Sequence, residues 1–105
     1  MAYSIDLEAI AKELDFDLED VEMLVDVFLD SAEEGLVELK DAIAQNDLES
    51  IFASSHAIKG SAANIKLDEI SSLARNIENS ARNNNTMDYE KEYNKLKELV
   101  ESIRV

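Results

Sequence analysis

The only histidine of the chain, His56, lies in the segment SHAIKGSAANIK at residues 55–66. Lys59 follows it after three residues and Gly60 after four, and the segment contains no acidic residue. A neutral imidazole nitrogen is a competent nucleophile near neutral pH. An ammonium group one helical turn away supplies positive charge and three donors to a group attached to the ring. The residue types and their spacing therefore indicate a histidine that carries a phosphoryl group.

Gly60 is an unfavourable choice inside a helix, since glycine there costs about 1 kcal/mol relative to alanine. Its lack of a side chain opens room beside the imidazole for an incoming group or for the surface of a partner protein. Two other interpretations stay open. Gly60 could serve close packing between helices, and Lys59 could be a solvated surface residue.

Amphipathic patterns predict five helices that would position this segment. The first is short, and the second is the longest, with Asp17 as its predicted N-cap. Short connections between such helices favour antiparallel neighbours. We therefore expect an all-α fold, an antiparallel up-down four-helix bundle with a short additional N-terminal helix, as a single domain over residues 1–105. The predicted helices cover residues 6–13, 17–45, 48–64, 68–83 and 87–103.

The orientation of His56 follows from a projection of the third helix at about 100° per residue. His56 lies about 140° from the middle of the apolar arc of this projection. Lys59, Gly60 and Ala63 lie close beside it. The imidazole is therefore expected to be exposed, next to a cation and to small residues. The arc expected to face the core holds Leu48, Ile51, Ser55, Ile58, Ala62 and Ile65.

The composition excludes several classes of function. The chain has no cysteine and one histidine, which leaves no ordinary zinc or copper site of nitrogen and sulfur ligands. A net charge of −14 would repel nucleic acid and anionic membrane surfaces. The chain has neither a run of roughly 20 apolar residues nor the pattern of a signal peptide at its start. We therefore expect a cytoplasmic protein that is not bound to a membrane.

The excess negative charge is confined to the first half of the chain. Residues 1–50 contain 16 acidic residues against two basic ones, a balance of −14, whereas residues 51–105 contain eight of each. His56 lies just beyond the acidic half. A dianionic group on the imidazole would therefore meet little repulsion from neighbours in the sequence.

The sequence HAIKGSAANI at residues 56–65 resembles the signature of histidine-containing phosphotransfer (HPt) domains, in which His-x-x-Lys-Gly is followed by small residues and an apolar position. The order of the helices and the segment LARNIE at residues 73–78 are similar to that family as well. The resemblance implies that His56 accepts a phosphoryl group from an aspartyl phosphate on a response-regulator receiver domain and passes it to another receiver. The sequence departs from the family at Lys66, where a glycine usually ends the motif helix.

The proposed phosphotransfer role gives individual residues expected functions. Lys59 would stabilise the phosphoryl group, and Gly60 would provide steric clearance for it. Glu78 matches an acidic position that, in some relatives fused to kinases, hydrogen-bonds the other ring nitrogen and so fixes the tautomer. The alternative for Glu78 is a solvated glutamate, with Arg75 one turn earlier as a further contact for phosphate.

Small and apolar residues near the histidine are candidates for the docking of a receiver domain. For Phe52, the alternative to a docking role is burial under the short first helix. The docking candidates are Phe52, Ala53 and Ala63.

No cofactor of its own is expected for this chain. Gly35 and Gly60 are its only glycines, so it has no Gly-rich loop for ATP, and the Mg²⁺ of the transfer reaction would be bound by the receiver. We expect a monomeric relay without enzymatic turnover of its own, with receiver domains as partners and a histidine kinase as a further candidate. Two alternatives stay open: a phosphate-independent HPt-like helical adaptor that binds a regulator or kinase, and a stand-alone phosphoacceptor domain for a chemotaxis-type kinase.

Overall fold

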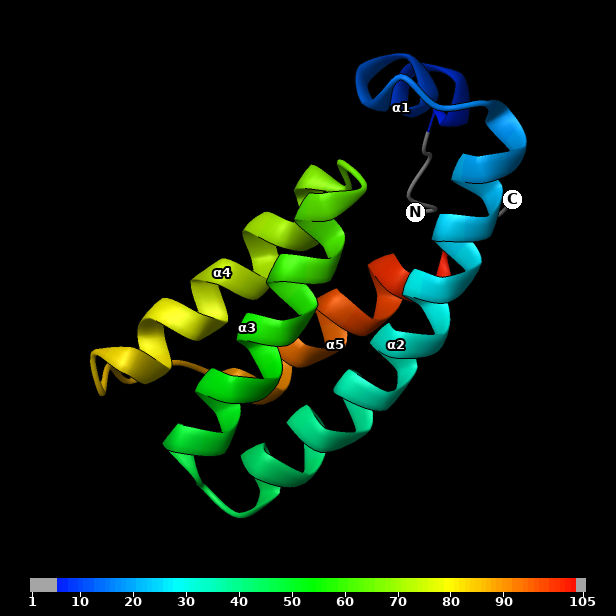
Figure 1. Cartoon of the computed structure of the whole chain (residues 1–105). Helices are drawn as coiled ribbons and strands as arrows, with labels where there is room; N and C mark the ends of the chain where they lie inside the picture. The colour runs from blue at the N-terminus through cyan, green and yellow to red at the C-terminus, as the bar shows by residue number, and fades with distance from the viewer. Residues whose placement is uncertain (1–5, 104–105) are drawn as a thin grey trace.

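The computed structural model of the chain describes residues 6–103, and it is all-helical, as predicted. This part of the chain contains five helices and no strand (Figure 1). Each predicted helix is present, and its observed ends differ from the predicted ones by two residues or fewer. The helices are α1 (Leu7–Leu14), α2 (Leu18–Ala44), α3 (Leu48–Asn64), α4 (Asp68–Arg82) and α5 (Tyr89–Glu101).

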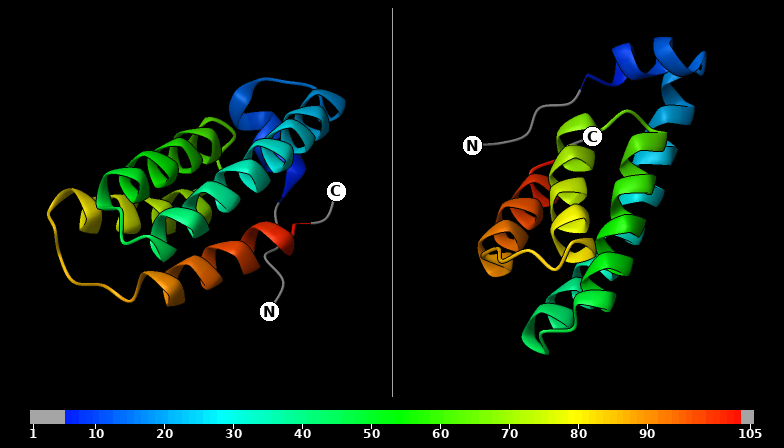
Figure 2. Two further views of the ribbon diagram at one scale, coloured as in Figure 1. Left: turned by 90° about the horizontal axis from the view of Figure 1, so that it is seen from below. Right: turned by 90° about the vertical axis from the view of Figure 1, so that its left-hand side faces the viewer.

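The four longer helices surround one hydrophobic core. Helix α3 packs most extensively against α4, α2 packs against α3 and α5, and α4 packs against α5. Two further views show α5 lying along α2 and α4 on the side away from α3 (Figure 2). The short helix α1 contacts only α2 among the described helices, and it lies at the end of α2 remote from the α2–α3 turn (Figure 1). The most deeply buried apolar side chains include Val21, Val25, Leu39, Ile51, Leu67, Ile70, Ile77 and Leu96.

The face of α3 predicted to point inward is buried in the structure, except for Leu48 at its start, which is partly buried. Ser55, a polar residue on this face, has no exposed surface, and its hydroxyl donates a hydrogen bond of 2.7 Å to the backbone carbonyl of Ile51. Ser54 donates in the same way to the carbonyl of Ser50, at 2.8 Å. Because a buried hydroxyl without a partner is unfavourable, these bonds allow serine to stand in the core.

Helix α2 approaches α3 closely at Gly35. A Cβ atom at this position would lie 2.9 Å from Cγ1 and 3.2 Å from Cδ1 of Ile58, which is a buried residue of α3. Since Ile58 is two residues from His56, this contact helps to fix the part of α3 that carries the imidazole. Close helix packing therefore occurs at Gly35, and the chain needs glycine there for a steric reason.

The turns after α1 to α4 each contain a residue in the left-handed region, although none of these residues is glycine. After α3, the N–H of Lys66 donates to the carbonyl of Ala63 (3.2 Å), and the N–H of Leu67 donates to that of Ala62 (2.9 Å). These two bonds form a Schellman motif. The departure at Lys66 therefore leaves the usual end of the motif helix intact, with a lysine at φ 62° in place of glycine. The residues with positive φ are Asp15, Asn46, Lys66 and Asn84.

Asp17, the predicted N-cap of α2, and Asp47, which precedes α3, are both N-cap residues. The Asp47 carboxylate accepts hydrogen bonds from the hydroxyl and the backbone N–H of Ser50, which hold the pKa of Asp47 below its ordinary value. The Asp17 side chain makes no capping bond, so it contributes to α2 through its charge near the helix N-terminus, while its backbone carbonyl accepts from the N–H of Val21.

Candidate functional site

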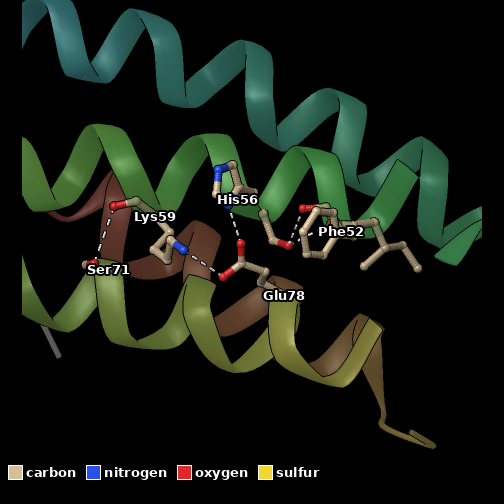
Figure 3. Close-up of polar contacts among 7 residues, drawn as sticks. Phe52, His56, Lys59, Ser71 and Glu78 are labelled. Atoms are coloured by element: carbon tan, nitrogen blue, oxygen red, sulfur yellow. Dashed lines mark hydrogen bonds and ion pairs between the residues drawn. The ribbon is translucent and has the colours of Figure 1, made fainter. Parts of the chain in front are cut away.

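The imidazole of His56 lies on the outer surface of α3, as the helical projection predicts. Its side chain is 59% exposed, whereas the neighbouring residue Ser55 is completely buried. The close-up shows the two nitrogens of the ring on opposite sides of it (Figure 3). One nitrogen is directed at Glu78 of α4, and the other is directed away from it.

Glu78 is the residue that joins α4 to the histidine. Its side chain is only 1% exposed, so the alternative of a solvated glutamate is wrong. One carboxylate oxygen, Oε2, is hydrogen-bonded to Nδ1 of His56, and the other, Oε1, accepts a bond of 2.8 Å from Nζ of Lys59 (Figure 3). A single buried carboxylate therefore binds both polar residues of the His-x-x-Lys-Gly motif.

Two opposing effects act on the ionisation of Glu78. Burial removes the carboxylate from water and by itself raises the pKa. The hydrogen bonds from Lys59 and His56, together with the charge of these groups, outweigh burial and hold the pKa of Glu78 below its ordinary value of 4.5. Glu78 is therefore a carboxylate near neutral pH, and a carboxylate can only accept hydrogen bonds.

The ionisation of Glu78 determines the tautomer of His56. Because the carboxylate only accepts, Nδ1 must carry the hydrogen of the bond between them. The hydrogen-free nitrogen of the neutral ring is then Nε2, which is the one directed away from Glu78 (Figure 3). An exposed nitrogen with a free lone pair, fixed by a bond at the opposite nitrogen, is suited to nucleophilic attack on an incoming electrophile.

Lys59 lies between α3 and α4 and is not a solvated side chain. It is 23% exposed and pairs with the buried Glu78 carboxylate. The hydroxyl of Ser71, on α4, donates to the backbone carbonyl of Lys59 at 3.3 Å. An ammonium group has three donors, and the bond to Glu78 uses one of them. The remaining donors of Lys59 are available to an anionic group close to the imidazole.

Gly60 has open space where a side chain would be. No heavy atom of a neighbouring element lies within 4 Å of a Cβ built at this position, so close helix packing does not explain the glycine. Ala53 and Ala63, the small docking candidates, are both exposed. The surface of α3 beside His56 therefore includes the small residues Ala53, Gly60 and Ala63.

Phe52 is half-buried against the core, and its ring is stacked on that of His56. The alternative in which Phe52 lies under the first helix is wrong, since α1 contacts α2 and not α3. The guanidinium of Arg82, on α4, lies over the Phe52 ring. Arg75 is exposed and makes none of the described contacts with His56.

Ser71 and Arg82 are members of the site that the sequence analysis missed. Arg82 follows Glu78 by four residues, which places both on one face of α4, so this spacing was the available signal. Ser71 had no such signal, because its contact depends on how α3 and α4 are aligned along their length.

Within residues 6–103, no group of three histidine, cysteine, aspartate or glutamate side chains is arranged to hold a metal ion. No helix in this range has the length and apolar character needed to cross a membrane.

Comparison with known families identifies one match. The model of the Hpt domain matches residues 23–105, which include the whole of α3, α4 and α5 and all the site residues described above. No match was found among curated proteins or among solved structures. Hpt domains act in the phosphotransfer reactions of two-component signalling, where they interact with receiver domains and kinases. The chain belongs to the Hpt domain family.

Proposed function

We propose that this chain is a phosphorelay intermediate in which Nε2 of His56 accepts a phosphoryl group from the aspartyl phosphate of a receiver domain and passes it to another receiver. The observation that carries the proposal is the bond between the exposed His56 ring and the buried Glu78 carboxylate. That bond leaves the outward nitrogen as the nucleophile.

Charge neutralisation supports the same reaction. Phosphoryl transfer passes through a loose transition state, so positioning and electrostatic stabilisation supply most of the catalysis. Nζ of Lys59 donates to Oε1 of Glu78 at 2.8 Å, the carboxylate that also binds the imidazole, and its other donors can bind the phosphoryl oxygens. The open space at Gly60 gives the phosphoryl group and the donor protein access to the ring.

The remaining parts of the reaction would belong to the partner. A receiver supplies the aspartyl phosphate, its Mg²⁺ and the acidic pocket that binds the metal, and this chain acts as a carrier without turnover of its own. In the proposal, the protein is a cytoplasmic monomer whose four longer helices form an antiparallel up-down bundle. Ala53 and Ala63 lie in the surface on which the receiver docks.

The proposal is tested by incubating the full chain with a panel of phosphorylated receiver domains and measuring acid-labile phosphate on this chain. We expect labelling of the natural protein and none of His56→Gln, which should fold normally because the ring is largely exposed. Circular dichroism and thermal unfolding check the fold of the variant. Labelling of His56→Gln would contradict the assignment of the acceptor. Receiver binding without any labelling would instead support the phosphate-independent adaptor.

A further inference from the structure

Phe52 and His56 form a stacked pair of rings on the surface of α3. Their ring centroids are 5.7 Å apart, and the ring planes are inclined by only 14°. The two residues are four positions apart, a spacing at which side chains on a helix meet. Offset stacking of aromatic rings is favourable beyond the burial of apolar area alone. The imidazole is therefore restrained on one face as well as at Nδ1.

Arg82 extends this stack to α4. Its guanidinium carbon lies 5.5 Å from the centroid of the Phe52 ring, within the range of a cation–π interaction. Phe52 is also half-buried against the hydrophobic core, so its ring is held from two directions. The phenyl ring is thus a fixed surface against which the imidazole rests.

The two restraints on His56 act on different motions. The hydrogen bond to Glu78 fixes the position of Nδ1, yet it leaves the ring able to tilt about the line of that bond. Contact with the flat face of Phe52 opposes this tilt. Only the two restraints together fix the direction in which Nε2 points. An in-line transfer depends on that direction, since a displacement of about 1 Å can slow a reaction by roughly 100-fold.

We propose that Phe52 is a positioning residue that fixes the plane of the His56 ring, and that Arg82 holds Phe52 in place. This inference rests on the proposed function and adds a residue to its machinery. In this proposal, Phe52 orients the nucleophilic imidazole and does not serve as a docking residue for the receiver. Docking would then depend on the small exposed residues of α3.

Because the chain has a single histidine, nuclear magnetic resonance can test the orientation directly in the full chain labelled with ¹⁵N-histidine. Phe52→Leu should shift the two carbon-bound imidazole protons, since the ring current of Phe52 is lost, and should leave Nδ1 protonated by its bond to Glu78. Phe52→Tyr should retain the natural shifts. Phe16→Leu is the matched control, because Phe16 is half-exposed between α1 and α2, far along the sequence from the site.

Kinetics of transfer from a phosphorylated receiver domain separate positioning from docking. Phe52→Leu should lower the saturating rate by roughly ten-fold or more and leave the half-saturating receiver concentration unchanged. Phe52→Tyr should restore the rate. Arg82→Gln should lower the rate severalfold, and Arg82→Lys should lower it less because a cation remains.

Two results would overturn the inference. One is that the imidazole signals of Phe52→Leu, like those of the control Phe16→Leu, do not differ from those of the natural protein. The other is a raised half-saturating concentration at an unaltered saturating rate, which would make Phe52 a docking residue. If no receiver labels the natural protein, the proposed function fails, and the spectra still decide whether the Phe52 ring is stacked on the imidazole in solution.

Discussion

His56 is held by a carboxylate that is almost completely buried. Glu78 binds Nδ1 of the ring with one oxygen and Nζ of Lys59 with the other, so it sets the tautomer of the nucleophile and holds the Lys59 ammonium group in place. The carboxylate is kept ionised because its two partners outweigh the effect of burial on its pKa. At the scale of the residue, the site therefore depends on Glu78 as much as on the histidine.

Glu78 makes the stability of the protein depend on pH in the acid range. Its folded-state pKa lies below the ordinary value of 4.5, so its stabilising effect is fully present above that value and is lost as the pH falls through the folded-state pKa. Glu78→Gln should lower the free energy of unfolding by about 2 kcal/mol at neutral pH, because a charged hydrogen-bonded pair is broken. The difference from the natural protein should shrink below pH 4.5.

Urea unfolding of the two proteins at a series of pH values measures this difference. Glu34→Gln is a suitable control, since Glu34 is an exposed residue within α2 and its loss should change stability by a few tenths of a kcal/mol at most. A gap between Glu78→Gln and the natural protein that stays constant from pH 7 to the acid range would show that Glu78 is not stabilised as a carboxylate.

Lys59 is expected to affect both transfer and stability. Lys59→Ala removes the cation that is paired with the same carboxylate as the imidazole, so the rate of transfer from a phosphorylated receiver should fall severalfold or more. It also leaves the buried Glu78 carboxylate with one partner fewer, so the melting temperature should fall too. Lys40→Ala, which removes an exposed lysine of α2, serves as the control in both measurements. An unaltered transfer rate for Lys59→Ala would reduce Lys59 to a structural role.

The two glycines of the chain have different roles in the helices around the site: one allows close packing of two helices, and the other leaves open space at the surface. Gly35 lets α2 approach Ile58 of α3, whereas Gly60 faces space that no neighbouring element fills. The same substitution at the two glycines should therefore have opposite effects. At the scale of the element, this contrast separates a glycine needed for packing from one that leaves room at the surface.

Gly60→Ala should raise the free energy of unfolding by about 1 kcal/mol, because alanine favours a helix and meets no neighbour. Gly35→Ala should lower it by about 1 kcal/mol, since the strain of crowding Ile58 exceeds the gain in helix propensity. Denaturant unfolding of the two variants gives both values. Destabilisation by Gly60→Ala would mean that this position is closely packed.

The turn from α3 to α4 contains backbone strain at Lys66 that a glycine at the same position would avoid. Lys66 adopts φ 62°, a conformation that a residue with a Cβ atom adopts at a penalty. Lys66→Gly should therefore stabilise the protein by about 1 kcal/mol in denaturant unfolding, with the Schellman bonds retained. Asn46→Gly, at the turn after α2, should gain less, because asparagine tolerates this conformation. Equal gains at the two turns would contradict this explanation.

Over the whole molecule, the periodicity of apolar residues predicted those structural features that are determined within one helix. The five helices, the inward face of α3 and the exposure of His56 all follow from the spacing of apolar residues along one element. The bond between His56 and Glu78 was only a possibility raised by family resemblance. It requires α3 and α4 to align so that residues 22 positions apart meet, and no local pattern specifies that alignment.

The same reason explains what the sequence could not reveal. Burial of Glu78 and the contact of Arg82 with Phe52 depend on the packing of α4 against α3. The pairing of Lys59 with Glu78 likewise joins two helices, so a lysine that could have been solvated is instead part of the site. Sequence patterns thus predicted the acceptor and its exposure, and the structure supplied the groups that orient it.

Nuclear magnetic resonance of the full chain labelled with ¹⁵N-histidine, recorded after incubation with a phosphorylated receiver domain, shows which nitrogen of His56 carries the phosphoryl group. Phosphorus should couple to Nε2 of His56, while Nδ1 keeps its hydrogen and its hydrogen bond to Glu78. Phosphate attached to Nδ1, or a phosphorylated chain whose only imidazole is unmodified, would contradict it.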